Sequence, residues 1–329
     1  MKIAIITDGN HTIGMGHVCQ SIALAGELEG KIGDEAEIYF ITKSESIVTD
    51  ELSRTGHEVF LLPDDKSIFE FLRNKSPDRI IFDKLDVSTD LARRIKETLG
   101  GKLVIFTNLT RANQYADITV LADIGSNFKN LCYRNKARKT THYFGPKYWI
   151  LRPEFYEYGG LKKDPSTRVE NLMLIFGGSD PSNLTQLVLE QLLSSETSFQ
   201  ILVALGAACS KSEEVNSVIL RHPKQKGNVS IVQNLKDVAK AMYHADLVLA
   251  SPGLSFFEAL SIGTPVIGFH QNELQQNVYK DCFPTLDKTE VVRLDSMINN
   301  RAFIFPDDPS VVSMEIGEGK DEIIHEILS

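Results

Sequence analysis

Short apolar runs alternate with amphipathic stretches along the chain, and this alternation restricts the possible folds most strongly. The runs expected to form strands are Lys2–Thr7, Glu37–Thr42, Glu58–Leu62, Arg79–Asp83, Lys102–Thr107, Asp117–Leu121, Leu172–Phe176, Gln200–Ala204, Val229–Val232, Leu247–Ala250 and Pro265–Phe269. The helical patterns are His17–Leu28, Ser67–Arg73, Ser88–Leu99, Asn183–Leu193, Leu235–Tyr243, Leu254–Ser261 and Leu274–Phe283. Continuous apolar strands joined by helices predict parallel sheets that are covered on both faces.

The length of 329 residues predicts two domains, because a single hydrophobic core rarely serves so long a chain. Residues 156–170 are polar, contain two glycines and lack periodicity, which is typical of a linker. We therefore expect an α/β protein with two Rossmann-like, doubly wound domains, 1–155 and 171–329, facing a cleft.

The charge and cysteine content exclude several classes of function. The formal net charge of -9 argues against broad binding of nucleic acid or anionic membranes, but not of a small anion. No run suggests a signal peptide or an integral membrane segment. The cysteines, at positions 19, 132, 209 and 282, are scattered, so we expect a cytoplasmic protein without a zinc site or disulfide framework. No metal or cofactor is predicted, and the oligomeric state stays open.

The first candidate site is the glycine-containing loop Asp8–His17, which follows the first strand. Its spacing matches neither the dinucleotide fingerprint nor the P-loop, yet Gly14 and Gly16 allow backbone amides to approach an anion. We expect His17, at a helix start, to stay neutral and able to accept a proton from water. A cap for the helix is an equally good interpretation of His17, and His11 is expected to be a solvent-facing turn residue.

Two further candidate sites follow strands of the second half. The turn Phe176–Asn183 begins with Gly177, Gly178 and Ser179 and precedes a helix, which suits phosphate or an ordinary Asp-Pro turn. The segment Ala250–Asn277 carries Glu258 on a helix, where its carboxylate could bridge two ribose hydroxyls or simply face solvent.

These segments together resemble the GT-B superfamily. The resemblance extends to its nucleotide-sugar hydrolases of pseudaminic acid biosynthesis and the related spore-coat polysaccharide biosynthesis proteins. The matching residues, in order, are Asp8 with Ile13-Gly14-Met15-Gly16-His17, then Gly145-Pro146-Lys147-Tyr148 with Leu151-Arg152-Pro153-Glu154-Phe155, then Gly177–Asp180, and finally Ser255–Leu260. The resemblance covers nearly the whole chain.

The resemblance implies that the second domain holds UDP and that water cleaves the sugar C1–O bond without a metal. The implied catalytic residues are His17, as the base, and Asp8. The implied substrate-binding residues are Gly14 and Gly16 in the first loop, Gly177, Gly178 and Ser179 at phosphate, Ser255 and Glu258 at the nucleoside, and Gln275 and Asn277 near the sugar. The chain departs from the pattern at Gln20, at Ile6-Thr7 and at Asp83-Lys84-Leu85, where relatives have arginine, arginine, and aspartate with an aromatic residue.

The favoured function is therefore hydrolysis of a UDP-(di)acetamido sugar to UDP and free sugar, for surface polysaccharide or nonulosonic acid biosynthesis. A GT-B glycosyltransferase with a UDP-sugar donor, a non-catalytic nucleotide-sugar binding protein and a hydrolysing 2-epimerase are the alternatives. A lipid acceptor would favour a basic patch, but the short run of Arg134, Lys136, Arg138 and Lys139 is expected to be a solvated loop.

Overall fold

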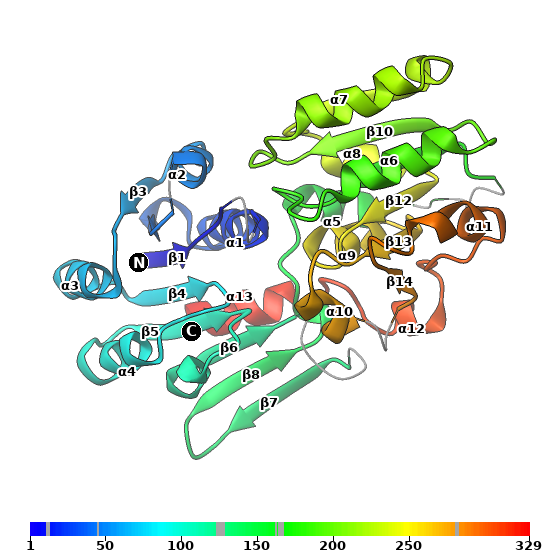
Figure 1. Cartoon of the computed structure of the whole chain (residues 1–329). Coiled ribbons are helices and arrows are strands. Elements are labelled where there is room, and N and C mark those ends of the chain that lie inside the picture. The colour runs from blue at the N-terminus through cyan, green and yellow to red at the C-terminus, as the bar shows by residue number, and fades with distance from the viewer. Residues whose placement is uncertain (11–13, 45, 123–128, 162, 164–167, 280–282) are drawn as a thin grey trace. The chain divides into compact units, whose positions relative to one another are not determined.

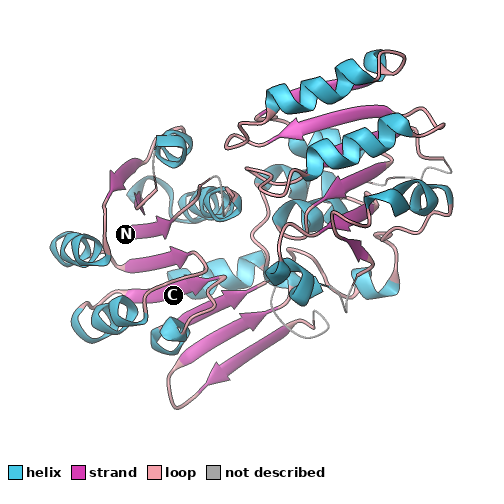
Figure 2. Cartoon of the chain, viewed as in Figure 1, coloured by secondary structure: helices cyan, strands magenta, loops and turns pink. Residues whose placement is uncertain are grey.

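The computed structural model describes residues 1–329 except 11–13, 45, 123–128, 162, 164–167 and 280–282. The described residues form two compact units, each with its own sheet. The first comprises Met1–Asn10, Gly16–Arg152 and Met314–Ser329, and the second comprises residues 14–15 and Pro153–Ser313. Both are α/β units in which helices alternate with strands (Figure 2).

The first unit is built on a sheet with the strand order β3-β2-β1-β4-β5-β6-β8-β7 among the described residues. Its strands are β1 (Lys2–Thr7), β2 (Glu37–Thr42), β3 (Glu58–Leu61), β4 (Arg79–Asp83), β5 (Lys102–Phe106), β6 (Ile118–Leu121), β7 (Leu131–Asn135) and β8 (Thr140–Phe144). Its helices are α1 (Gly16–Ile32), α2 (Ser46–Ser53), α3 (Asp65–Lys75), α4 (Thr89–Thr98) and α13 (Lys320–Leu328). All neighbouring strands are parallel except β7 and β8, which are antiparallel.

The second unit has a parallel sheet with the order β11-β10-β9-β12-β13-β14. Its strands are β9 (Asn171–Ile175), β10 (Gln200–Leu205), β11 (Val229–Gln233), β12 (Leu247–Ala250), β13 (Val266–Phe269) and β14 (Thr285–Leu286). Its helices are α5 (Pro153–Gly159), α6 (Leu184–Ser194), α7 (Ser212–Arg221), α8 (Val238–His244), α9 (Leu254–Ser261), α10 (Glu273–Tyr279), α11 (Leu294–Asn299) and α12 (Pro309–Val312).

The cores explain why the apolar runs became central strands. On one face of the first sheet, Ile80 and Phe82 of β4 pack in a cluster with Leu72 of α3 and Ile95 of α4. The intervening Ile81 is also fully buried, so β4 is covered on both faces as its uninterrupted apolar sequence requires. The predicted two-domain parallel α/β architecture is confirmed.

The basic run between residues 134 and 139 is exposed, as expected of a solvated loop, but its first residue belongs to a strand. Arg134 lies in β7, and residues 136–139 form the turn that leads to β8 (Figure 1). The strand was missed because Leu131–Asn135 is mostly exposed at the edge of the sheet and has no buried apolar pattern.

The end of the chain differs from the expected domain 171–329, because residues 314–329 belong to the first unit. Helix α13 buries Ile323, Ile324 and Ile327. The Arg79 guanidinium donates to the carbonyl oxygens of Ile327 and Leu328, at 2.5 and 2.9 Å. The first unit therefore uses both ends of the chain.

The expected linker 156–170 begins within helix α5, and residues 162 and 164–167 lie outside the described part. Lys163 is fixed to the second unit: its Nζ donates to Ala245 O and Thr264 Oγ1, both at 2.7 Å. Burial lowers the pKa of Lys163 to about 8, against the weaker opposing charge of Asp246.

Candidate functional site

Three charged residues lie at the ends of two adjacent strands, at the carboxyl edge of the first sheet. Strands β1 and β4 pair in parallel, with Thr7 opposite Asp83. Asp8 follows β1, Asp83 ends β4 and Lys84 comes next, so the parallel register brings these side chains to one edge. This is the edge at which open α/β sheets bind their ligands.

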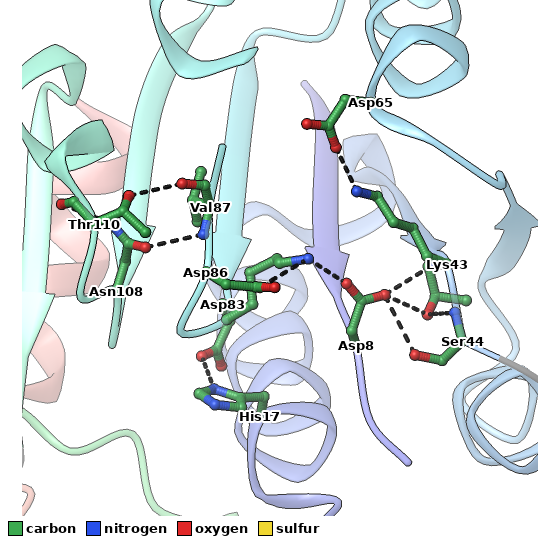
Figure 3. A network of polar contacts seen from close by, with 12 residues as sticks. Asp8, His17, Lys43, Ser44, Asp65, Asp83, Asp86, Val87, Asn108 and Thr110 are labelled. Atoms are coloured by element: carbon green, nitrogen blue, oxygen red, sulfur yellow. Dashed lines mark hydrogen bonds and ion pairs between the residues drawn. The ribbon is translucent and has the colours of Figure 1, made fainter. Parts of the chain in front are cut away.

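His17 forms a dyad with Asp83 at this edge (Figure 3). The imidazole, on the second residue of α1, donates from Nδ1 to Asp83 Oδ1 at 2.8 Å. Asp83 is completely buried, whereas 14% of the His17 side chain is exposed. Because the carboxylate accepts from Nδ1, a neutral imidazole carries its lone pair at Nε2, the atom that can take a proton from water.

The other oxygen of Asp83 is held by the helix that carries His17. Gln20 Nε2 donates to Asp83 Oδ2 at 2.9 Å, and Ser21 Oγ donates to the same atom at 3.3 Å. Gln20, which departs from the family pattern, is therefore buried within the dyad's support. Three donors from one helix fix the carboxylate and thus the ring.

Asp8 is held by a dense set of donors. Its Oδ1 accepts from Lys43 N at 2.7 Å, Thr42 Oγ1 at 3.1 Å and Ser44 Oγ at 3.3 Å, and its Oδ2 pairs with Lys84 (Figure 3). Burial raises the pKa of Asp8, but Lys84 and these hydrogen bonds outweigh burial, and the net pKa lies below the ordinary value. This geometry supports a positioning role for Asp8 that joins β1, β2 and β4.

Asp83 and Lys84 were missed as site residues, although the sequence showed them as a departure from the family pattern. The sequence did contain a signal for Asp83, because an acidic residue at the end of a buried apolar strand lies at the sheet edge where ligands bind. The sequence alone could not show that Asp83 meets His17, because the two residues are 66 positions apart. Their contact follows only from the order of the strands in the sheet.

In the second unit, the predicted phosphate turn follows β9. Gly177 has a φ of +82°, in the left-handed region that favours glycine, while Ser179 is buried. The Asp180 carboxylate accepts from Leu184 N at 2.9 Å and Thr185 N at 2.8 Å. These first amides of α6 are therefore occupied, which leaves the turn itself as the part of this segment that could meet a phosphate.

Helix α9, after β12, begins differently. Its cap residue, Gly253, has a φ of +140° and contributes no side-chain acceptor. Ser255 lies in the first turn and is partly buried. Glu258 is completely buried, so the alternative interpretation as a surface helix residue was wrong.

Helix α10 carries Gln275 and Asn277, after β13. Gln275 connects two loops, because its Nε2 donates to Pro252 O at 2.8 Å and its Oε1 accepts from Gln271 N at 2.7 Å. Asn277 is exposed. Strands β9, β12 and β13 are neighbours, so the predicted residues of the second unit gather at one edge of its sheet.

Gln271 was not predicted, yet it joins these loops. Its Nε2 donates to Phe176 O at 2.9 Å and to Asp180 Oδ1 at 3.1 Å, and its Oε1 accepts from Ser182 N at 3.1 Å. It therefore fixes the turn after β9 relative to the start of α10. Gln271 belongs to the segment 271–277, which is rich in glutamine and asparagine, and this composition could have marked it as a candidate.

The remaining predicted residues lie around the β1–α1 connection. Gly16 is the exposed first residue of α1, and Gly14 has a φ of +79° and groups by its contacts with the second unit. His11 lies outside the described residues. The predicted residues of the first half therefore belong to the first unit, except for Gly14, and those of the second half belong to the second unit.

Other sites are not evident in the described part of the chain. There, no three histidine, cysteine, aspartate or glutamate side chains are grouped as metal ligands would be. Cys19, Cys132 and Cys209 form no disulfide, and Cys282 lies outside the described residues. None of the described helices is both long and apolar enough to cross a membrane. The absence of a metal requirement stays a prediction.

Comparison with known proteins places the chain among bacterial and archaeal relatives. No protein-family model matches it. An uncharacterized protein of Methanocaldococcus jannaschii is 40% identical over 330 residues, covering 99% of this chain and 66% of that protein. The spore coat polysaccharide biosynthesis protein SpsG of Bacillus subtilis is 29% identical over 287 residues, covering 84% of this chain and 79% of SpsG. The chain thus spans just under two thirds of the archaeal relative.

Solved structures show the fold. MurG of Acinetobacter baumannii superposes with a TM-score of 0.62 at 13% identity, covering 100% of this chain and 99% of MurG. A UDP-glucosyltransferase of Polygonum tinctorium has a TM-score of 0.59 at 12% identity, with 99% and 92% covered. HepE of Anabaena, solved with UDP-glucose, has a TM-score of 0.55 at 12% identity, with 100% and 98% covered. The chain is therefore a homologue of SpsG that has the GT-B fold.

Proposed function

We propose that this protein is a nucleotide-sugar hydrolase that converts a UDP-(di)acetamido sugar and water to UDP and free sugar. The observation that carries the proposal is the His17–Asp83 dyad at the start of α1. The homology to a polysaccharide biosynthesis protein and the UDP-glucose bound by HepE support a nucleotide sugar as substrate. The product would supply surface polysaccharide or nonulosonic acid biosynthesis.

The proposed reaction is a displacement by water at the anomeric carbon. His17 Nε2 takes a proton from water as its oxygen attacks C1. The bond between C1 and the diphosphate oxygen breaks, and its electron pair leaves with UDP. The product sugar is inverted at C1. Asp83 keeps the ring oriented and stabilises the imidazolium that forms, through the bond at Nδ1.

UDP would be held by the second unit. The uncapped start of α9 offers backbone amides and a positive helix end to the diphosphate, as does the glycine turn at 177–179. Such groups stabilise the charge of departing UDP without a cation. Asn277 on α10, which is exposed, would approach the sugar.

The test is release of UDP by the pure protein from the UDP-diacetamido-trideoxy sugar, with EDTA present and no acceptor. We expect equal amounts of UDP and free sugar, and a rate about 10²- to 10⁴-fold lower in His17→Ala, the usual contribution of a general base. His222→Ala is the matched control. His222, the residue after α7, also meets a carboxylate, that of Glu190 on α6, at 2.8 Å, and its loss should leave the rate unchanged.

Two results would contradict the proposal. UDP release by His17→Ala at the rate of the unsubstituted protein would remove His17 as the base. Release of UDP only after an acceptor is added would instead identify a glycosyltransferase with the same nucleotide site.

A further inference from the structure

Lys84 is a buried cation placed next to the dyad. It directly follows Asp83 at the end of β4, and 9% of its side chain is exposed. Its Nζ meets two carboxylates, pairing with Asp8 and lying 3.2 Å from Asp86 Oδ1. Burial lowers the pKa of Lys84, but Asp8 and Asp86 outweigh burial, and the net pKa lies above the ordinary value. Lys84 is therefore charged at neutral pH.

The loop that carries Lys84 is fixed by the next strand connection (Figure 3). Asn108 Oδ1 accepts from Val87 N at 3.0 Å, and Thr110 Oγ1 donates to Val87 O at 2.7 Å. Leu109 N donates to the carbonyl of Leu85 at 2.9 Å. The ammonium is thus held in place before any ligand arrives, which reduces the ordering cost of binding.

The two carboxylates that meet Lys84 differ in how firmly they are held. Asp8 has backbone and hydroxyl donors in addition to Lys84 and is nearly buried. The side chain of Asp86 is 82% exposed, so water competes with Lys84 for this carboxylate and weakens the pair. A ligand can therefore displace Asp86 readily but not Asp8.

An ammonium group also has three N–H donors. The described residues supply two acceptors for them, Asp8 and Asp86. If Asp86 is displaced, Lys84 can offer two hydrogen bonds to a ligand while Asp8 continues to balance its charge. Carbonyl and hydroxyl oxygens, the groups of an acetamido sugar, are suitable acceptors.

We propose that Lys84 binds the sugar of the substrate, donating hydrogen bonds to a carbonyl or hydroxyl oxygen that takes the place of Asp86. The inference rests on the proposed function, because it requires a nucleotide sugar at this edge. Lys84 would then be a specificity residue of this chain, at a position where the resembled family has an aromatic residue.

The experiment measures the affinities of UDP and UDP-N-acetylglucosamine by calorimetry. Lys84→Met is combined with Asp8→Asn, so that neither buried charge is left unpaired. Lys96→Gln is the matched control, because Lys96 also pairs with an aspartate, Asp117, but at the opposite edge of the same sheet. Thermal unfolding of each variant confirms that it is folded.

We expect the unsubstituted protein to bind the UDP-sugar more tightly than UDP, and the double variant to lose about tenfold or more of that preference. Its affinity for UDP alone should change less than twofold, whereas Lys96→Gln should match the unsubstituted protein. A single Asp86→Asn variant, which retains Lys84, should bind the UDP-sugar several-fold more tightly.

Three results would overturn the proposal. An unchanged sugar preference in the double variant would show that Lys84 does not contact the sugar, with UDP binding still intact. A parallel loss of UDP affinity would place Lys84 at the diphosphate instead. A protein that binds neither UDP nor the UDP-sugar would overturn the proposed function together with this inference.

Discussion

At the scale of single residues, the proposed role of His17 as a base depends on Asp83. The carboxylate is buried and accepts hydrogen bonds on both oxygens, so its orientation is fixed. Loss of any of these donors would be costly, because a buried charge without hydrogen bonds is unfavourable. An imidazole bonded to it through Nδ1 keeps one tautomer and one ring position. The histidine and aspartate should therefore act as a unit, as residues of one hydrogen-bond network do.

This coupling gives a prediction for Asp83→Asn. Because an asparagine cannot stabilise the imidazolium and its amide opposes the donors of Gln20 or His17, UDP release should slow by about 10²- to 10⁴-fold. The loss should not add to that of His17→Ala: the double variant should be nearly as active as His17→Ala alone. The rates of UDP release by Asp83→Asn, His17→Ala and the double variant, each compared with the unsubstituted protein, test this coupling. Independent, multiplying losses would show that Asp83 acts on something other than His17.

Residue identities were predictable where the chemistry is local and unpredictable where it depends on the fold. His17 and Asp8 stand in a glycine loop that sequence reasoning could single out. Asp83 and Lys84 meet His17 and Asp8 only because β1 and β4 are neighbours in the sheet, and no local pattern encodes that neighbourhood. The buried state of Glu258 was likewise invisible, since its neighbours on α9 fit either a surface or a buried helix.

At the scale of elements, β13 and β14 are joined by a buried histidine. Nε2 of His270 shares a hydrogen bond of 2.6 Å with Thr285 Oγ1, and within the described residues its Nδ1 has no partner. Burial lowers the pKa of His270 below its ordinary value of 6.5, while Asp287 and Glu290 oppose that shift less strongly. The folded protein therefore favours the neutral ring.

The sign of the resulting pH dependence follows from linkage. The unfolded chain takes up the proton near pH 6.5, whereas the folded chain resists it. The contribution of His270 to stability is therefore complete above that pH and is lost as the pH falls toward the lowered folded-state pKa. We expect the free energy of unfolding to fall between pH 7.5 and 5.5, and to fall less in His270→Gln. Denaturant unfolding across this range measures the difference. An NMR titration that placed the pKa of His270 above 6.5 would contradict it.

Central strands were predictable from the sequence, whereas an edge strand and a helix cap were not. The apolar runs of the central strands were recognised because burial on both faces leaves a continuous pattern. The edge strand β7 lacks that pattern, and the α6 cap could not be assigned to Asp180, four residues before the first amide it accepts from. Which side chain satisfies a helix end depends on the loop path, which short sequence patterns specify poorly.

At the scale of the whole molecule, the first unit is closed by the last residues of the chain. Lys102 Nζ donates to Glu326 O at 2.9 Å, and Gly319 N donates to Lys147 O at 2.8 Å. Together with the three buried isoleucines of α13, these contacts attach the chain end to a sheet formed more than 170 residues earlier. Sequence reasoning could not foresee this return, because an amphipathic terminal helix fits either unit equally well.

Removal of residues 314–329 should therefore destabilise one unit and spare the other. Each unit has its own hydrophobic core, so two unfolding transitions are expected. Loss of three buried isoleucines, at about 1.5–3 kcal/mol each, predicts that the transition of the first unit falls by several kcal/mol. The transition of the second unit should stay within experimental error.

Asp321→Ala, on the exposed side of α13, is the control that keeps the helix and should shift neither transition by more than about 1 kcal/mol. Urea unfolding followed by residue-resolved hydrogen exchange assigns each transition to its unit. Equal destabilisation of both units would mean that the chain unfolds as one cooperative block, and an unchanged first unit would mean that α13 is not part of its core.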